Sequence, residues 1–378
     1  MLGSVRAAGV LVLGFFSAAA FSPDLLAQAP PAAVKAAGKE PALTLGGLIQ
    51  VQGEAGDKGD SRFATANDRF YLRRARLNAA GKFLEEFDFR LELDLTGSLA
   101  ESSNLRAQAT DAYITWNRNP AAQVRFGQFK SPFGHEQLFS DPRLPTMERG
   151  LANDRLTYGR QIGVMVFGDL LDKRLSYWAG LFNGNSVNTT ANDNDEMSPY
   201  FRVSAQLYRG LLFGKEGTLS AGANAYSSED AAVTLSGLGF DATPATADRD
   251  NIFAGKRAGL GYDLQLKAPG ARFEVWAEWL EGDFEPLNSR PLADFDAEGY
   301  ALQASYFIVA ERFEIVARHE HFDANTSVDG NETTIETLGL NYFFKGHEIK
   351  GMVNVLQVDD ELQPDSATRV LARLQVIF

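Results

Sequence analysis

Basic residues are concentrated in and beside one stretch, 130–159, which interrupts an otherwise regular alternating pattern. Guanidinium and ammonium groups attract anions, and the planar fork of Arg donates two hydrogen bonds at once to a phosphate or carboxylate. Acidic residues interspersed among them leave a second interpretation open, in which each base is ion-paired locally or simply solvated. The candidate anion-binding residues here are Lys130, Arg143, Arg149, Arg155 and Arg160. The acids among them are Glu136, Asp141, Glu148 and Asp154.

A second basic cluster, Arg69, Arg73, Arg74 and Arg76, lies nearer the amino terminus. Arg74 and Arg76 share one strand face with Leu72 and Asn78, and we expect this face to point inward. The next segment carries Arg90, Glu92 and Asp94. The cluster therefore predicts either an ion-pair ladder along the wall or a basic track that guides anions.

Residues for other chemistry are sparse. The chain has no Cys and four His, of which His319 and His321 share a strand face without a third metal ligand nearby. The sequence contains no phosphate-binding Gly-Lys-Ser loop, nucleophile elbow or zinc-binding HExxH motif. We expect no metal, no cofactor and no enzymatic activity, with an outer-membrane enzyme as an alternative.

The alternation of side chains predicts that the elements which position these residues are β-strands. Between 87 and 95, apolar side chains occupy every second position and charged side chains occupy the positions between them. A strand separates two such sets onto opposite faces, whereas a helix scatters them. Similar segments recur from Thr44 to the end. Their second face is too polar for the interior of a soluble β-sandwich, but it suits a water-filled lumen.

The pattern predicts an all-β fold, a transmembrane antiparallel β-barrel of about 16 strands with an inward-folded constriction loop. Short turns alternate with long loops, an asymmetry typical of outer-membrane barrels. The expected strands are 44–54, 68–81, 86–98, 108–117, 122–129, 160–169, 174–183, 199–208, 217–227, 256–267, 271–281, 298–308, 312–321, 333–343, 347–358 and 368–378.

The constriction loop is expected at Lys130–Gly159. A stretch of about thirty residues without strands of its own is either functional or disordered. Its apolar residues argue against disorder and predict that it packs on the inside of the barrel wall. These residues are Phe133, Leu138, Phe139, Leu144 and Met147. An infolded loop that carries basic residues narrows the pore and favours anions.

The last ten residues alternate over the length of a transmembrane strand and end in Phe378. Val370, Leu374 and Val376 fall on the expected lipid face. Arg373 and Gln375 fall on the other face, where we expect them to line water.

The amino terminus reads as an export signal. Arg6 precedes a short apolar run, and small residues follow near Ala27, so we expect a cleaved signal peptide over 1–27. A disordered spacer over 28–43 and a barrel domain over 44–378 follow. The formal net charge of −13 argues against nucleic acid as a partner.

Several segments resemble the phosphate-selective porin O and P family. The most specific is Val124–Phe133, which contains Gly-Gln-Phe-Lys-Ser-Pro-Phe. The others are Phe70–Leu77, Asp111–Trp116, Arg160–Val164, Gly180–Gly184 and Gly339–Tyr342. The resemblance covers most of the chain after the signal.

The resemblance implies a sixteen-stranded barrel of the Gram-negative outer membrane, exported through the periplasm, in contact with outer-membrane lipid and usually a homotrimer. It implies passive diffusion of small anionic solutes, with phosphate or polyphosphate as type substrates, and makes Phe378 an assembly signal. The many strand carboxylates depart from a strongly basic channel. A general porin without anion preference and a structural or adhesive barrel with a blocked lumen therefore remain as alternatives.

Overall fold

A computed structural model describes residues 34–35, 42–58, 62, 67–96, 107–234, 252–287, 293–363 and 365–378. The expected signal peptide, 1–27, lies outside these residues, as does most of the expected spacer, 28–43. Within that spacer the two residues of β1, Val34–Lys35, pair with the start of the next strand.

Long antiparallel strands make up most of the chain because its alternating faces satisfy lipid and water at once. They are β2 (Ala42–Gly56), β3 (Arg69–Phe83), β4 (Phe87–Asp94), β5 (Gln108–Asn119), β6 (Ala122–Lys130), β7 (Arg160–Leu170), β8 (Leu175–Phe182), β9 (Ser198–Leu212), β10 (Lys215–Thr234), β11 (Ile252–Ala268), β12 (Phe273–Pro286), β13 (Phe295–Val309), β14 (Phe313–Asp323), β15 (Glu332–Lys345), β16 (Ile349–Asp360) and β17 (Ala367–Ile377).

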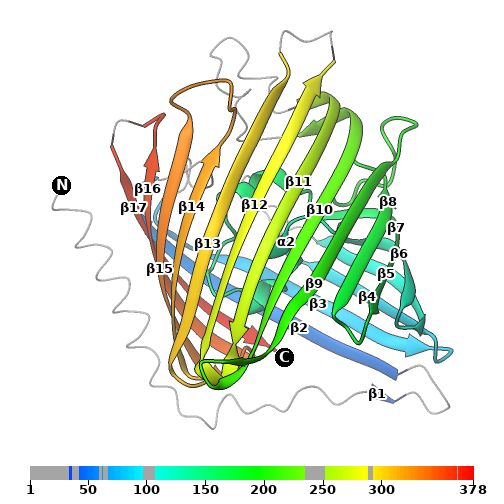
Figure 1. Cartoon of the computed structure of the whole chain (residues 1–378), viewed down its shortest axis with the longest axis horizontal. Coiled ribbons are helices and arrows are strands. Elements are labelled where there is room, and N and C mark those ends of the chain that lie inside the picture. Colours follow the sequence, from blue (N-terminus) through cyan, green and yellow to red (C-terminus); the bar gives the residue numbers. More distant parts are fainter. Residues whose placement is uncertain are drawn as a thin grey trace.

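The strands from β2 to β17 form a closed barrel of sixteen (Figure 1). Each pairs antiparallel with the next along the chain, and β17 pairs with β2, with Leu374 opposite Val51 and Gln375 opposite Gln50. Closure leaves no strand edge unpaired, which a bilayer requires. No helix of the described part of the chain is long and apolar enough to cross a membrane. The predicted fold class is confirmed.

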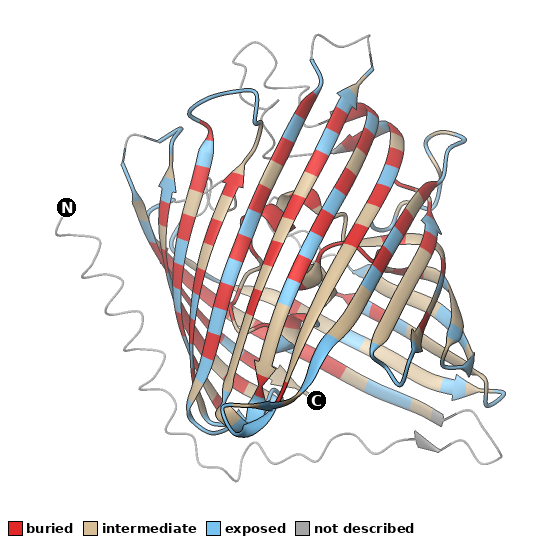
Figure 2. Cartoon of the chain, in the orientation of Figure 1, coloured by how far each residue is buried: buried red, intermediate tan, exposed pale blue. Residues whose placement is uncertain are grey.

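The two faces of each strand differ as the alternation predicted (Figure 2). On β13, Tyr300, Leu302 and Tyr306 are exposed on the outside, while Ala301 and Gln303 between them are buried inside. The exposed apolar face is the one that contacts lipid in a barrel of this type.

The observed strand bounds agree with the predicted ranges to within a few residues, except where strands extend beyond their predicted ends. The strand β10 extends to Thr234 and β12 extends to Pro286, beyond the expected ends at 227 and 281. The added residues mix polar and acidic side chains with apolar ones, of which Val233 and Phe284 are buried. Their apolar positions are too few for hydrophobic periodicity to mark the strand ends, and backbone pairing with the neighbouring strand extends both strands.

The stretch between β6 and β7 folds into the barrel, where α2 lies within the ring of strands (Figure 1). It contains three short helices: α2 (His135–Leu138), η2 (Asp141–Arg143) and α3 (Leu151–Leu156). Another 3-10 turn, η4 (Pro269–Ala271), joins β11 to β12. We call 131–159 the constriction loop.

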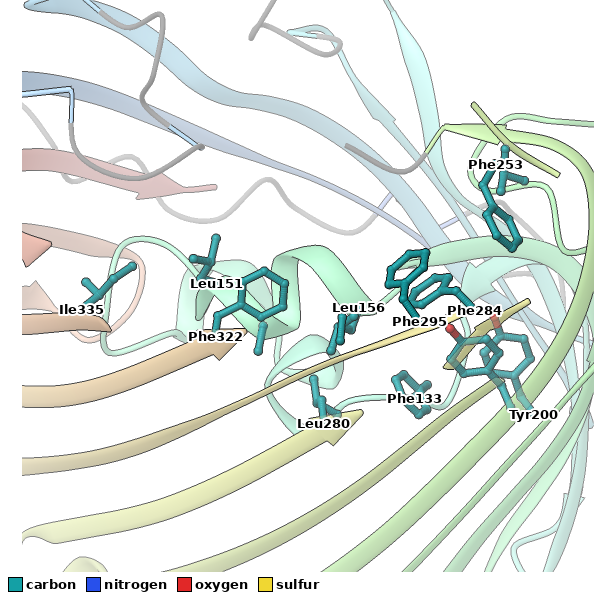
Figure 3. Packing of buried hydrophobic residues seen from close by; sticks show 14 of the residues in the cluster. Phe133, Leu151, Leu156, Tyr200, Phe253, Leu280, Phe284, Phe295, Phe322 and Ile335 are labelled. Carbon is teal, nitrogen blue, oxygen red and sulfur yellow. The ribbon is translucent and has the colours of Figure 1, made fainter. Parts of the chain in front are cut away.

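An apolar core lies inside the barrel, between the constriction loop and the wall (Figure 3). Phe133, Leu151 and Leu156 of the loop belong to the same buried cluster as Leu280 of β12 and Phe322 of β14. Of the five apolar loop residues expected to pack inward, Phe133, Leu144 and Met147 are almost fully buried. This packing holds the loop against one side of the wall.

Candidate functional site

The constriction loop leaves the wall through a narrow neck. Ser131 N–H donates to the Gly159 carbonyl at 2.9 Å, which joins the two ends of the loop. Gly134 and Gly159 have φ angles of 81° and 64°, in a region that other residues rarely adopt. These glycines let the chain turn sharply from the strand direction into the lumen.

Carboxylates of the wall hold the helical parts of the loop. Glu278 of β12 accepts the His135 and Glu136 amides, and Glu320 of β14 accepts the Leu151 amide at 2.6 Å. The first amides of a helix lack partners within the helix, so an acceptor there satisfies them. Arg318 of β14 in turn pairs with Glu136 at 3.0 Å.

Side chains of the last strands hold the middle of the loop. Asn354 accepts the Met147 amide at 2.7 Å, and Asn341 donates to the Pro145 carbonyl at 2.7 Å. Lys350 donates to the Leu144 carbonyl at 3.0 Å. Arg373 and Gln375 point inward as predicted, but the loop buries both, so the expectation that they line water is wrong.

Glu148 joins the loop to both ends of the barrel sequence. Its carboxylate pairs with Arg73 of β3 at 2.8 Å and with Arg373 of β17 at 2.6 Å. Burial alone raises the pKa of Glu148, but Arg73 and Arg373 outweigh that effect and hold the pKa well below its usual range.

Asp141 at the start of η2 contacts three guanidinium groups. Arg149 lies at 2.6 Å, Arg76 at 2.6 Å and Arg74 at 3.4 Å. Burial raises the pKa of Asp141, yet Arg74, Arg149 and Arg76 together hold it well below its usual range. Arg76 also pairs with Asp94 at 2.7 Å and with Glu92 at 3.6 Å. Arg74 and Arg149 have Asp141 as their shared carboxylate partner.

Lys130 and Arg160 flank the neck of the loop. Lys130 donates to the Gln137 and Phe139 carbonyls at 2.7 and 2.6 Å, so its ammonium group ties the start of the loop down. Arg160 pairs with Asp111 of β5 at 2.6 Å, and Arg90 of β4 reaches the same carboxylate at 3.3 Å. Together with the ion pairs of Arg76, these contacts form an ion-pair ladder along the wall. Such a ladder was one of the two interpretations of the second basic cluster.

Arg155 and Arg143 have different surroundings. Arg155 is largely buried and lies 3.4 Å from the exposed Asp154. Arg143 is exposed and makes no ion pair within the described residues. The structure thus gathers Arg74, Arg76 and Arg149 around one carboxylate and leaves Arg143 as an exposed basic residue of the loop.

Three residues of the site were not among the predicted anion-binding residues, although Arg73 was named in the second basic cluster. Arg73 faces inward with Arg74 because a register shift between β2 and β3 at Gln50–Val51 interrupts the alternation. Lys350 was not singled out, although its inward position follows from the alternation along β16. Arg125 on β6 lies among aromatic rings. It falls within the predicted strand 122–129, but no role was predicted for it.

The loop covers the wall unevenly. Inward-facing residues of β12 to β17 are almost all buried, among them Trp276, Arg318 and Gln375. Near the short-turn ends of β4 to β8, inward-facing residues such as Arg90, Tyr113 and Trp178 retain partial exposure, whereas Gln161 and Phe182 nearer the loop are buried. The wall at β4 to β8 is therefore accessible from the lumen at the short-turn end of the barrel.

Comparisons with known proteins agree with this geometry. The family model for phosphate-selective porin O and P matches residues 45–378. Porin O of Pseudomonas aeruginosa is 22% identical over 360 residues, covering 88% of this chain and 76% of that protein.

Two solved structures share the fold. The trimer form of OmpT from Vibrio cholerae has a TM-score of 0.62 at 11% identity, covering 90% of this chain and 100% of that one. An anion-selective porin from Comamonas acidovorans has a TM-score of 0.61 at 14% identity, with coverage of 90% and 100%. The extent of the family match, the closed barrel and the infolded loop lead to one conclusion: the chain belongs to the phosphate-selective porin O and P family of outer-membrane porins.

Proposed function

We propose that this porin lets small anions, such as phosphate or polyphosphate, diffuse passively through the constriction in preference to cations. The observation that carries the proposal is the cluster in which Arg74, Arg76 and Arg149 share the carboxylate of Asp141, two residues before the exposed Arg143. Fixed positive charge at a constriction lowers the energy of an anion that has lost part of its hydration there.

Arg143 supports the proposal because it is an exposed cation on the same loop segment. Neither a carboxylate of the described residues nor burial offsets its charge. An exposed guanidinium can offer two parallel donors to a phosphate oxygen pair, and the contact stays reversible because water competes for the same donors. Reversible contact is what a diffusion channel needs.

The acidic net charge of the chain does not contradict an anion preference. Glu281 of β12 lies directly opposite Glu298 of β13, and Asp283 lies opposite Asp296, all on the outward strand face. These carboxylates belong to the end of the barrel where the long loops lie. Part of the negative charge therefore stands outside the lumen and away from the constriction.

The remaining parts of the proposal follow from family membership. A barrel with short turns at one end and long loops at the other inserts with the short turns facing the periplasm. Export through the periplasm, contact with outer-membrane lipid and assembly as a homotrimer belong to this proposal, and the trimeric OmpT fold supports the last of them. A channel role needs neither catalysis nor a cofactor.

Reversal potentials in planar bilayers under a salt gradient test the proposal. The folded protein should conduct in steps, with the sign of anion selectivity. Arg143→Glu should shift the potential toward cations and lower the anion-to-cation permeability ratio several-fold. The matched control is Arg312→Glu, which makes the same charge change in the short turn between β13 and β14 and should leave the ratio nearly unchanged.

Two outcomes contradict the proposal in different ways. Cation selectivity of the unaltered protein excludes an anion preference but leaves the porin role intact. An absence of stepwise conduction by folded protein supports a blocked lumen instead. Competition between phosphate and chloride currents in the same bilayers then reports whether phosphate is favoured over other small anions.

A further inference from the structure

Arg125 of β6 lies among three aromatic rings on a part of the wall that the constriction loop does not cover. Its guanidinium carbon lies 4.2 Å from the centroid of Tyr113, 4.9 Å from that of Phe167 and 5.5 Å from that of Phe129. Its Nε donates to Thr115 Oγ1 at 3.0 Å. Rings near a guanidinium attract its charge and fix the orientation of its plane.

Arg125 differs from the neighbouring arginines of the wall in having no acid partner. Arg76, Arg90 and Arg160 each pair with a carboxylate, whereas no carboxylate of the described residues lies within ion-pairing distance of Arg125. Its two terminal nitrogens donate no hydrogen bond to the described wall, and the residue is partly exposed. Two donors of a preoriented guanidinium therefore face the lumen.

The aromatic residues beside Arg125 continue along the wall. Phe167 of β7 lies directly opposite Trp178 of β8, and both face inward. Tyr113, Phe167 and Trp178 are partly exposed, whereas Phe129 behind them is buried in the core. The wall from β5 to β8 thus presents a basic group within a strip of accessible ring surface.

This strip lies on a part of the wall that the loop does not cover. The loop buries most of the inner face of β12 to β17, whereas Arg125, Tyr113 and Phe167 keep partial exposure toward the lumen. Arg125 also precedes Lys130, where the loop begins, by five positions along β6, which places it toward the short-turn end of the barrel. A solute reaches it on the periplasmic side of the constriction.

We propose that Arg125, Tyr113, Phe167 and Trp178 form a binding station for aromatic monocarboxylates, of which benzoate is the simplest. The proposal rests on the anion-passing function proposed above and specifies a solute class for it. The two free donors match the two oxygens of a carboxylate. The ring of the same solute lies against Phe167 and Trp178, a contact that inorganic phosphate cannot make.

Block of chloride current by benzoate in planar bilayers tests this station. We expect benzoate to interrupt single-channel current at concentrations at least tenfold lower than acetate does. Arg125→Gln should weaken benzoate block about tenfold, and Phe167→Leu should weaken it without altering acetate block. Arg125→Lys keeps the charge but loses the planar fork, so it should retain only part of the effect.

The matched control is Arg143→Gln, which removes a lumen charge from the loop rather than from the strip. It should lower anion selectivity while leaving the preference of benzoate over acetate unchanged. Heat-modifiable migration of each variant in gels verifies that the barrel has folded, and Phe167→Leu is a second test if Arg125→Gln does not fold.

Equal block by benzoate and acetate in the unaltered protein would overturn the station. Competition by phosphate in chloride solution without acetate would also overturn it, if phosphate displaced benzoate from Arg125 as effectively as benzoate itself binds there. Both results leave the reversal potential in potassium chloride untouched, so failure of the station is distinguishable from failure of the anion preference itself.

Discussion

Glu148 of the constriction loop and Arg373 of the last strand are joined at 2.6 Å inside the barrel. The same carboxylate pairs with Arg73 of β3, so one loop residue bridges strands on both sides of the seam where β17 meets β2. Gln50 and Gln375 also bond across that seam at 2.7 Å. The position of the loop is thus coupled to barrel closure.

Replacing Glu148 by Gln should release the loop. The change leaves the guanidinium groups of Arg73 and Arg373 without their shared counter-charge, and breaking a buried ion pair costs about 3–5 kcal/mol. We expect a lower unfolding temperature and a larger, noisier single-channel conductance, because the loop no longer stays against β14 to β17. Bilayer recordings and thermal melts of the same preparation measure both effects.

The matched control for this change is Glu332→Gln, which removes a carboxylate from the outer, exposed face of β15. It should alter neither melting nor conductance. Unchanged conductance of Glu148→Gln beside a lowered melting temperature would show that the pair stabilises the barrel but does not position the loop.

We expect acid to loosen the constriction loop only below about pH 5. The pKa of Glu148 is depressed in the folded protein, so its ion pairs contribute stability that is fully present above its unfolded value, about 4.3. That stability is lost only as the pH falls from there through the folded pKa. Conductance should stay constant from about pH 7 to 5 and rise only in stronger acid. Glu148→Gln should remove this acid-dependent rise, and a rise centred near pH 6 would assign it to another group.

Asp141→Asn should strengthen the anion preference. It removes the carboxylate that Arg74, Arg76 and Arg149 share and keeps nearly the same side-chain shape. The reversal potential should move further toward anions, with a several-fold increase in the permeability ratio. Asp154→Asn is the control, because Asp154 lies on α3 and is exposed. A shift toward cations would show that the arginines retreat from the pore when Asp141 is neutral.

Periodicity alone predicted the barrel well because each strand repeats the same two-residue pattern over its membrane segment. On β14, Ile315 and Ala317 face outward while Glu314 and Arg318 face inward, as the alternation requires. The inward fold of the loop was also predictable, because apolar side chains such as Phe133 and Met147 are stable only when packed away from water. Such inferences depend only on local chemistry.

The pairing within the site was not predictable, because it depends on contacts between residues far apart in sequence. The shared contacts of Asp141 with Arg74 and Arg76 join positions on separate elements, and no local pattern specifies them. Bulges add a second difficulty. The register shift that turns Arg73 inward breaks the period of two on which the interpretation of that strand relied.

Phe378 offers a last prediction, because the structure separates its backbone role from that of its ring. The Gly47 amide donates to the Phe378 carbonyl at 2.7 Å, and the Phe378 amide donates to the Gly47 carbonyl at 3.1 Å. Neither bond needs the aromatic ring, which is about half exposed. If the ring is an assembly signal, Phe378→Ala should reduce the amount of barrel in the outer membrane several-fold while refolding in detergent proceeds normally.

Gly47→Val distinguishes a signal from a packing contact. A Cβ at Gly47 would stand 2.5 Å from the ring of Phe378, so the ring must move aside while remaining present. Membrane assembly of Gly47→Val should therefore exceed that of Phe378→Ala if recognition of the ring matters. Ile377→Ala, one position earlier, serves as the control and should assemble normally. Equal loss of detergent refolding in Phe378→Ala and Gly47→Val would instead make ring packing on Gly47 the reason for the terminal Phe.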